Sequence, residues 1–396
     1  MKKKIIFRTG SLRMGGLERI YIEVLQNINK EKYEVIAIID DDCGNENIFE
    51  KDIPTEVKYY FLKSQKLIKK TEYYKERRKN IFCKLMYNLY MNFETFIMYK
   101  NMKKLLKRIG KIDVLVDFDA GASKYIEKLN VPKKIVWIHN SIPKLKKTKS
   151  KIDRFGKRLE KYDKIVAICD EMKEELQQIY PKIKDKIIRI YNPFDFNRIE
   201  KLSENKEELN KKQKEMLKEN YIVSISRLDN VQKDFSTLLR ALKILKDKNI
   251  KEKLYIIGDG PSKSEIEKEI EILDLRDTAF LIGSTKNPYV WLKNSDFFVH
   301  SSKYEGLPTV LIEALICNKM IISSNCPTGP KEILLKESCG RLFKVGDYKE
   351  LSKLIEEYVL NKEKRELFYS NIKKRKNDFN KICIIKEYEK LLDSEK

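Results

Sequence analysis

The sequence predicts two α/β domains in tandem, each built on a Rossmann-like, doubly wound sheet of parallel strands. Three observations predict this class. The chain has 396 residues, too many for one ordinary core and enough for two. Hydrophobic residues make up 42% of it, so both cores can be packed although 36% of the residues are charged. Short apolar runs alternate with helical patterns along both halves, which is typical of α/β sheets.

The first domain opens with a strand, a glycine-bearing turn, a helix and a second strand. The first apolar run covers residues 3–10, and the turn after it contains Gly15 and Gly16. A helical pattern follows, and the next apolar run covers residues 33–40. This order is the usual opening of a doubly wound domain. Further short strands are predicted at residues 112–118, 133–139, 163–169 and 186–193.

A polar stretch at residues 200–220 indicates where the first domain ends, because an exposed helix or linker has this composition. We therefore expect an N-terminal Rossmann-like domain at residues 1–198 and a second Rossmann-like domain at residues 199–375. Residues 376–396 are expected to form a C-terminal helix that packs back toward the N-terminal domain. Strands of the second domain are predicted at residues 221–228, 254–260, 279–283, 296–301 and 320–324.

The chain is strongly basic, and its positive charge is unevenly distributed along the sequence. Lysine and arginine number 83 against 60 acidic residues, for a formal net charge of +23. Residues 61–111 carry fifteen of these cations against three acids, and residues 133–158 carry ten against one. Such a field favours an anionic partner, namely nucleic acid, a membrane surface or a phosphorylated substrate. Lysine, isoleucine and asparagine are abundant throughout, so compositional bias is an equal explanation for much of the excess.

The cysteines and the apolar runs indicate the compartment. Seven scattered cysteines without a C-x-x-C pair are typical of reduced thiols, and they argue against a disulfide framework or a zinc site. The apolar run near the N-terminus is too short for a signal peptide, and no uninterrupted apolar run reaches 18 residues. We expect a cytoplasmic protein, either soluble or peripheral on the inner face of the cell membrane.

The most informative motif lies in the second half. Residues 301–315, SSKYEGLPTVLIEAL, place Glu305 in a Gly/Pro loop and Glu313 eight residues later in a helix. A loop that enters a helix N-terminus presents free N–H groups and the positive end of the helix dipole, which suits a diphosphate. Gly306 permits close approach of the backbone to a ligand. The alternative is that both glutamates are simply solvated.

The pattern S-x-x-E-G-x-P-x-x-L-x-E-A resembles the signature of retaining glycosyltransferase family 4, of the bacterial polysaccharide and glycan-assembly type. This resemblance implies the GT-B fold, in which residues 1–198 form the acceptor-side domain and residues 199–375 the nucleotide-sugar-binding domain. The cleft between the domains would hold a nucleotide-sugar donor that is UDP-linked by preference. It implies no cofactor and no obligatory metal. In such enzymes Glu305 contacts the donor sugar and Glu313 the ribose hydroxyls. The adjoining residues expected to bind donor are Gly306, Leu307, Pro308 and Thr309.

Other segments resemble the family's donor-binding elements. Arg227 and Lys233, spaced R-x5-K between a strand and a helix, are expected to grip the diphosphate and stabilise charge that develops as it leaves. Asn287 belongs to a loop that resembles the one cradling the base. Gly15 and Gly16 resemble the glycine loop beneath the donor phosphates.

Histidine is scarce, and only His139 and His300 occur. His139 ends a predicted strand, where the resemblance implies a catalytic histidine that faces the donor sugar; a structural role is the alternative. His300 is expected to support the loop. The catalytic set implied is therefore His139, Glu305, Arg227 and Lys233. The acidic triple at residues 40–42 is interpreted as a solvated loop and not as a metal site.

Together these features favour a hexosyltransferase that moves a hexose or N-acetylhexosamine to a glycan or lipid-linked acceptor in cell-surface polysaccharide assembly. A nucleotide-sugar epimerase or another GT-B-fold enzyme is the alternative, and a basic nucleic-acid-binding protein is suggested by charge alone. Residues 81–108 mix apolar and basic side chains, which suits a helix lying on an anionic membrane. An ordinary helix buried on one face is an equal interpretation. Contact with such a membrane would involve residues 61–111 and 133–158.

Overall fold

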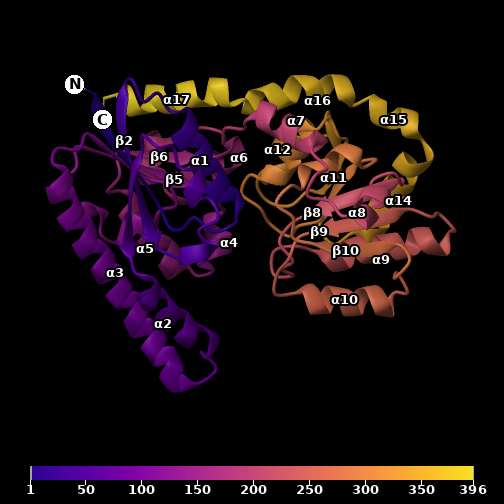
Figure 1. The fold of residues 1–396 in the computed structure, drawn as a ribbon, viewed down its shortest axis with the longest axis horizontal. Coiled ribbons are helices and arrows are strands. Elements are labelled where there is room, and N and C mark those ends of the chain that lie inside the picture. The colour runs from indigo at the N-terminus through magenta and orange to yellow at the C-terminus, as the bar shows by residue number, and fades with distance from the viewer. Residues whose placement is uncertain (1, 396) are drawn as a thin grey trace. The chain divides into compact units, whose positions relative to one another are not determined.

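A computed structural model describes residues 2–395, which fold as two compact units (Figure 1). Of the described residues, unit one comprises 2–194 and 381–395, and unit two comprises Asp195–Asn380. Each unit has one sheet in which every strand pair is parallel, and helices pack on these sheets. The predicted fold class, two α/β domains with Rossmann-like sheets, is confirmed.

Unit one contains a seven-stranded sheet in the order β3-β2-β1-β4-β5-β6-β7. The order runs outward in both directions from the neighbours β1 and β4, so the chain reverses direction across the sheet at this point. The apolar centre of β1 is fully buried, as its continuous hydrophobic run predicts. The strands are β1 (Lys3–Thr9), β2 (Tyr33–Asp41), β3 (Lys58–Lys63), β4 (Val114–Asp117), β5 (Lys133–Ile138), β6 (Lys164–Ala167) and β7 (Ile187–Arg189).

The helices of unit one include the last helix of the chain. They are α1 (Gly16–Asn27), α2 (Gln65–Glu76), α3 (Ile81–Ile109), α4 (Ile142–Lys146), α5 (Lys149–Leu159), α6 (Asp170–Ile179) and α17 (Lys381–Asp393). α17 packs against α1, and its Tyr388 ring stacks on Trp137 of β5 with centroids 4.9 Å apart. Lys133 Nζ also donates to the Leu391 carbonyl at 2.6 Å. The C-terminal helix is thus part of the unit-one core.

Unit two contains a six-stranded sheet in the order β10-β9-β8-β11-β12-β13. Its strands are β8 (Tyr221–Ile225), β9 (Lys253–Ile257), β10 (Ala279–Gly283), β11 (Phe298–His300), β12 (Ile321–Ser324) and β13 (Gly340–Phe343). Its helices are α7 (Phe196–Glu204), α8 (Lys211–Met216), α9 (Phe235–Asp247), α10 (Lys263–Ile272), α11 (Tyr289–Asn294), α12 (Thr309–Ile316), α13 (Pro330–Ile333), α14 (Tyr348–Leu360), α15 (Lys362–Glu366) and α16 (Tyr369–Arg375). One cluster of buried apolar residues joins α9, α10 and α14 to the strands. Fully buried residues of α11 and α12, such as Trp291 and Leu311, also belong to the interior of this unit.

The polar stretch at residues 200–220 is not a bare linker. It forms the end of α7 and the short helix α8, and α7 packs against α11 with Ile199 fully buried. The expected boundary after residue 198 falls inside α7, whereas the two compact units divide after Phe194. None of the described helices, including the long α3, is apolar enough over a sufficient length to cross a bilayer.

Candidate functional site

In unit two, the carboxyl ends of β8 and β11 lie side by side where the strand order reverses. Open α/β sheets bind ligands at such a switch point. The loop after β8 carries Arg227 and Lys233, and the loop after β11 carries Glu305. A single backbone bridge between Lys233 and Ser302 joins the two loops. Two motifs that are far apart in the sequence therefore meet at one edge of the sheet.

Glu305 is the centre of a buried polar cluster. Lys233 Nζ forms an ion pair with Glu305 Oε1, and 12% and 8% of these two side chains are exposed. Ser302 Oγ donates to the same oxygen at 2.7 Å, and His300 Nε2 lies 3.1 Å from it. The second oxygen accepts from Gln232 Nε2 at 3.1 Å. Both carboxylate oxygens are therefore held by partners within unit two.

The surroundings keep Glu305 ionised. Burial by itself raises the pKa of a carboxyl group, but the Lys233 charge and the contact with His300 outweigh it and lower the pKa of Glu305 to about 2. Burial and the same Lys233 charge lower the pKa of His300, so that its imidazole is neutral near pH 7. The cluster consequently contains one cation, one anion and a neutral histidine.

The loop at residues 327–329 is hydrogen-bonded to the backbone of Glu305. Glu305 N–H donates to the Pro327 carbonyl at 3.1 Å, and Thr328 Oγ1 donates to the Glu305 carbonyl at 2.5 Å. Gly329 has φ of +96°, and a Cβ there would lie 2.6 Å from the Gly306 carbonyl oxygen. The roles of Ser302, Gln232 and Thr328 were not apparent from the sequence, where only the Thr-Gly-Pro order signals a constrained turn.

Arg227 is exposed, and no carboxylate of the described residues lies within ion-pair distance of it. The backbone of the loop that carries Arg227 contacts the turn after β9. A Cβ on Gly258, whose φ is +149°, would lie 1.9 Å from the Ser226 carbonyl oxygen, and one on Gly260 would lie 2.4 Å from the Leu228 carbonyl oxygen. The two glycines thus allow the backbone contact that positions Arg227.

The helix α12 continues directly from the Glu305 loop. Leu307 and Pro308 are buried, Thr309 is the first helical residue, and within the described residues no side chain caps this N-terminus. Glu313 is half-buried in the second turn, where its Oε1 accepts from Tyr289 Oη at 3.3 Å. Gly306 to Thr309 and Glu313 thus form one continuous segment with Glu305.

Asn287 has a different environment from the Glu305 cluster. Its side chain is buried, and Nδ2 donates to the carbonyls of Leu202 at 2.8 Å and Asn205 at 3.1 Å. The side chain therefore ties the loop after β10 to the end of α7. A role in base binding would fall to the main chain of this loop, as the sequence resemblance implies for residues 285–287.

In unit one, His139 directly follows β5. Its ring lies 4.9 Å from that of Phe118 between centroids, and its buried Nε2 has no hydrogen-bond partner among the described residues. Burial lowers the pKa of His139 to about 4, against a weaker opposing effect of Asp119. The imidazole is therefore neutral near pH 7 and has one unpaired ring nitrogen.

Gly15 and Gly16 lie at the start of α1, where Gly15 is the residue before the helix and Gly16 the first within it. The Glu18 carboxylate lies against this turn, because a Cβ on Gly15 would be 2.2 Å from Glu18 Oε2. Burial raises the pKa of Glu18, and Ser11 Oγ donates to its Oε1 at 3.1 Å. A carboxyl group beside the glycine turn was not expected from the sequence.

The strand-order reversal of unit one is occupied by a buried ionic cluster that sequence reasoning missed. Arg8 of β1 is 1% exposed, and its Nη1 donates to Asp117 Oδ1 at 3.0 Å. Arg8 also pairs with Asp40 and Asp119, and Tyr162 Oη donates to Asp117 Oδ2 at 2.5 Å. A charged residue inside an apolar strand was the available sequence signal, since it needs buried partners.

The interpretation of residues 40–42 as a solvated loop is wrong for Asp40 and Asp41. Both belong to β2, Asp40 is buried against Arg8, and Asp41 pairs with Lys63 at 2.6 Å. Asp42 accepts instead from Gly44 N–H at 3.0 Å. The cationic partners draw the first two carboxylates inward. Nowhere in residues 2–395 do three metal-ligating side chains gather for one ion, and the expectation of a metal-independent enzyme remains a prediction.

Comparison with known proteins connects both units to one enzyme class. The family model described as glycosyl transferases group 1 matches residues 205–375, and that described as glycosyltransferase family 4 matches residues 14–198. The chain belongs to the glycosyltransferases. As a glycosyltransferase it has the two-domain GT-B architecture, and its site cluster lies in the part that the group 1 model covers.

Individual relatives agree with this assignment. An uncharacterized glycosyltransferase of Methanocaldococcus jannaschii is 36% identical over 44% of this chain and 43% of its own length. A Campylobacter jejuni enzyme, named as an N-acetylgalactosaminyltransferase acting on an N-acetylgalactosamine-N,N'-diacetylbacillosaminyl-diphospho-undecaprenol, is 30% identical over 44% of this chain and 47% of its own length. The chain thus matches about half the length of these two relatives. Anabaena Alr3699/HepE, solved with UDP and glucose, has the same fold, with a TM-score of 0.77, 16% identity, and coverage of 99% of this chain and 100% of its own.

Proposed function

We propose that this glycosyltransferase moves a hexose or N-acetylhexosamine from a UDP-linked sugar to a glycan or lipid-linked acceptor, with retention of the anomeric configuration. One observation carries the proposal. The carboxylate of Glu305 is held ionised against Lys233, directly before the uncapped N-terminus of α12 and eight residues before Glu313. A cation, helix N–H groups and two carboxylates in this order suit the phosphates and hydroxyls of a nucleotide-sugar.

The donor is proposed to bind along this segment. Arg227 and Lys233 neutralise the diphosphate. The exposed Arg227 can donate two parallel hydrogen bonds from its guanidinium, and Lys233 supplies a localised charge held in place by its ion pair. The main chain from Gly306 to Thr309 approaches the sugar and phosphates, and Glu313 accepts from the ribose hydroxyls. We propose, from the family resemblance, that the loop of Asn287 binds the base and that the glycine turn at Gly15 and Gly16 binds the phosphates.

The reaction is proposed to occur on one face of the sugar. The acceptor hydroxyl oxygen bonds to the anomeric carbon as the bond from that carbon to the diphosphate oxygen breaks. The proton of the hydroxyl passes to the departing diphosphate, so no further base is needed. Arg227 and Lys233 stabilise the leaving group electrostatically, and no metal is required for this. Glu305 and the unpaired Nε2 of neutral His139 orient the sugar.

The named relatives support the choice of donor and acceptor. Anabaena Alr3699/HepE is described with UDP and glucose, and the Campylobacter relative is named for a diphospho-undecaprenol acceptor. A Staphylococcus aureus relative, 24% identical over 58% of this chain, is named for capsular polysaccharide biosynthesis. By analogy we place the protein in the cytoplasm, at the inner face of the membrane where a lipid-linked acceptor would be available.

The test is a thermal-shift screen of the purified protein against UDP-, GDP- and ADP-sugars. We expect UDP-sugars to raise the midpoint of unfolding, and Glu313→Ala to abolish the rise because the ribose contact is lost. Glu267→Ala, on the exposed surface of α10, is the matched control and should leave the rise intact. A rise that persists in Glu313→Ala, or no rise with any UDP-sugar, would contradict the proposal. A separate product assay tests the epimerase alternative, which predicts release of the epimeric sugar without sugar transfer.

A further inference from the structure

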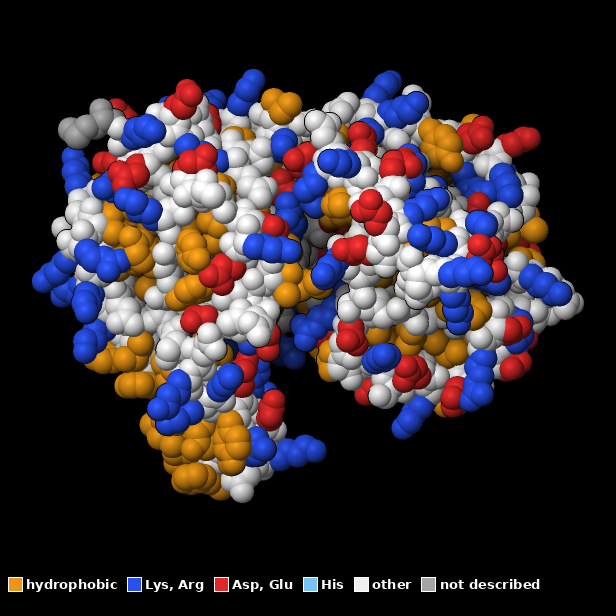
Figure 2. Space-filling model, viewed as in Figure 1, with side chains coloured by type: hydrophobic (Ala, Val, Ile, Leu, Met, Phe, Trp, Pro, Cys, Tyr) orange, Lys and Arg blue, Asp and Glu red, His pale blue; other side chains and the backbone are white. Residues whose placement is uncertain are grey.

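The helix α3 exposes an apolar stripe to water. Its members, each between 49% and 60% exposed, are Phe82, Leu85, Leu89, Phe93 and Phe96. The spacing of three and four residues places them on one face of the helix. Hydrophobic side chains gather over the projecting end of α2 and α3 in Figure 2. A contiguous exposed apolar surface of this kind marks an interaction site.

Cations flank the stripe, and their charge is not compensated. Lys66, Lys69 and Lys70 are exposed on α2, which packs along α3. No carboxylate within residues 2–395 forms an ion pair with any of these three lysines. The three acids of the hairpin have other partners, since Glu72 pairs with Arg13, Glu94 with Lys63 and Glu76 with Arg77. Four more exposed cations, Lys75, Arg77, Arg78 and Lys79, lie at the hairpin turn.

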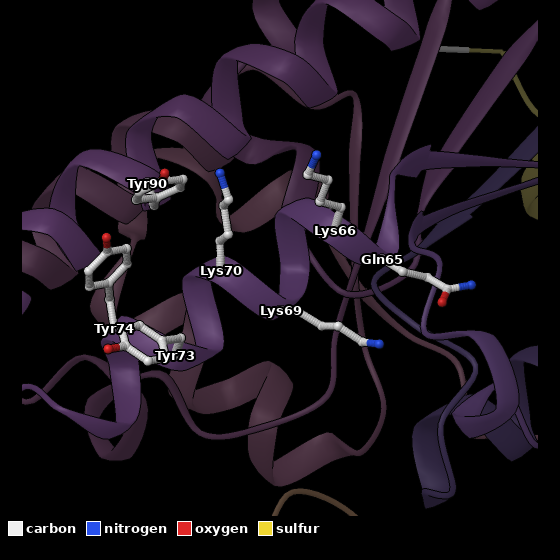
Figure 3. Close-up of a pocket in the computed structure, with 7 residues that line it drawn as sticks. All are labelled: Gln65, Lys66, Lys69, Lys70, Tyr73, Tyr74 and Tyr90. Atoms are coloured by element: carbon white, nitrogen blue, oxygen red, sulfur yellow. The ribbon is translucent and has the colours of Figure 1, made fainter.

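The lysines also line a cavity between the two helices. It measures about 540 Å³ and is lined by Gln65, Lys66, Lys69, Lys70, Tyr73, Tyr74 and Tyr90 (Figure 3). Tyr74 of α2 and Tyr90 of α3 stack with centroids 5.3 Å apart. A second cavity of about 400 Å³ shares Lys66, Lys70 and Tyr90 and continues to Phe93 and Ile97. Ammonium groups beside aromatic and apolar walls suit a phosphate that carries an apolar chain.

The hairpin is firmly attached to the sheet. Lys63 of β3 pairs with Glu94 of α3 at 2.7 Å, and Thr71 of α2 donates to the same carboxylate. Asn101 Nδ2 donates to the Leu62 carbonyl at 2.7 Å. These buried contacts join both helices to the edge strand, so the stripe and the lysines are presented together as one surface.

We infer that the α2–α3 hairpin docks this enzyme on an anionic lipid bilayer, with the apolar stripe in the interface and the α2 lysines on lipid phosphates. Charge complementarity favours this occupant: two copies of the hairpin would bring their unpaired cations together, whereas an anionic bilayer offers phosphates beside apolar chains. The inference deepens the proposed function and rests on it in one respect, because a lipid-linked acceptor is reached only at a bilayer.

The experiment is co-sedimentation of the full chain with phosphatidylglycerol/phosphatidylcholine vesicles and with pure phosphatidylcholine vesicles. The stripe variant carries Leu85→Ser, Leu89→Ser and Phe93→Ser, and the lysine variant carries Lys66→Gln, Lys69→Gln and Lys70→Gln. Two matched control variants lie in unit two. Ile272→Ser with Leu367→Ser removes exposed apolar side chains, and Lys263→Gln with Lys268→Gln removes exposed lysines. Each variant is also measured by thermal shift with UDP-sugar and by analytical ultracentrifugation.

We expect the wild type to bind anionic vesicles more tightly than neutral ones and to dissociate at high salt. Either hairpin variant should lower the partition coefficient about tenfold or more, and the controls should not. Failure of the wild type to bind anionic vesicles, or unchanged binding by the stripe variant, would overturn the inference. So would a wild-type dimer that the stripe variant converts to a monomer. Thermal shifts retained in the variants show that the donor site is intact, so a failed vesicle experiment is distinguishable from a failed proposed function.

Discussion

Lys233 and Glu305 form a buried ion pair, although 72 residues separate them in the sequence. Each follows a different strand, and the two strands are neighbours in the sheet of unit two. The pair thus joins the cation expected at the donor diphosphate to the carboxylate expected at the donor sugar. Since the charge of Lys233 and the contact with His300 together lower the pKa of Glu305 to about 2, loss of Lys233 would raise this pKa.

The first prediction concerns the coupling of this pair. Lys233→Met should lower the free energy of unfolding by about 3–5 kcal/mol, because it leaves the Glu305 carboxylate buried without its cation. The double variant with Glu305→Gln should be less destabilised than the sum of the single variants, by about 1 kcal/mol or more. Urea denaturation measures all four proteins. Lys243→Met, which breaks an exposed pair, is the control. Strict additivity would refute the coupling.

The second prediction concerns pH. The pKa of His139 is lowered from 6.5 in its ordinary state to about 4, so between these values the unfolded chain binds more protons than the folded one. Stability should therefore rise with pH from about 4 to 6.5. His139→Gln should flatten this slope, although His300, whose pKa is also lowered, keeps part of it. Thermal unfolding across this range is the measurement, and equal slopes in both proteins would be inconsistent with a buried neutral His139.

The third prediction concerns the ionic cluster of unit one. Arg8→Met should lower the free energy of unfolding by about 3–5 kcal/mol, because three carboxylates would lose their shared cation in a buried site. Arg13→Met removes a half-buried arginine that also pairs with two carboxylates, at the surface, and it should cost about 1 kcal/mol or less. Chemical denaturation compares them. Similar losses in the two variants would show that the cluster contributes no more than a surface ion pair.

The fourth prediction concerns the backbone contact beneath Arg227. Gly258→Ala places a Cβ 1.9 Å from the Ser226 carbonyl oxygen, so the loop must shift. We expect a loss of about 1–3 kcal/mol in stability and weaker UDP-sugar binding in the thermal-shift assay. Gly346→Ala also has positive φ, at +82°, but meets no atom within 4 Å. It should be strained without affecting nucleotide binding, and UDP-sugar binding retained in Gly258→Ala would argue against this role of the turn.

Much of the fold could be predicted from the sequence, because buried parallel strands read as short continuous apolar runs. The two strands that were not predicted, β3 and β13, lie at sheet edges. β3 reads KYYFLK with its first two residues exposed, and β13 reads GRLF, which has a glycine and an arginine in place of an apolar run. An edge strand has one strand neighbour and a more exposed surface, so its hydrophobic pattern is weaker.

The site was only partly predictable. Glu305 and Glu313 stand out through the E-x7-E pattern, and Lys233 through its resemblance to the family's diphosphate-binding segment. Of these three residues, Glu305 and Lys233 meet in space. Ser302 and Gln232 did not stand out, because small polar residues are common in loops and their roles depend on which loops the sheet brings together. The burial of Asp40 depended likewise on Arg8, which lies 32 residues earlier.

The most direct test of the proposed function is the anomeric configuration of the product. The wild type and Glu305→Gln would be incubated with the UDP-sugar that gives the largest thermal shift and with lipid-linked acceptors, and the product examined by NMR. We predict release of UDP and a new glycosidic bond with the configuration of the donor, at a rate lowered about 10²–10³-fold in Glu305→Gln. A product of inverted configuration, or transfer that Glu305→Gln leaves unchanged, would contradict the account.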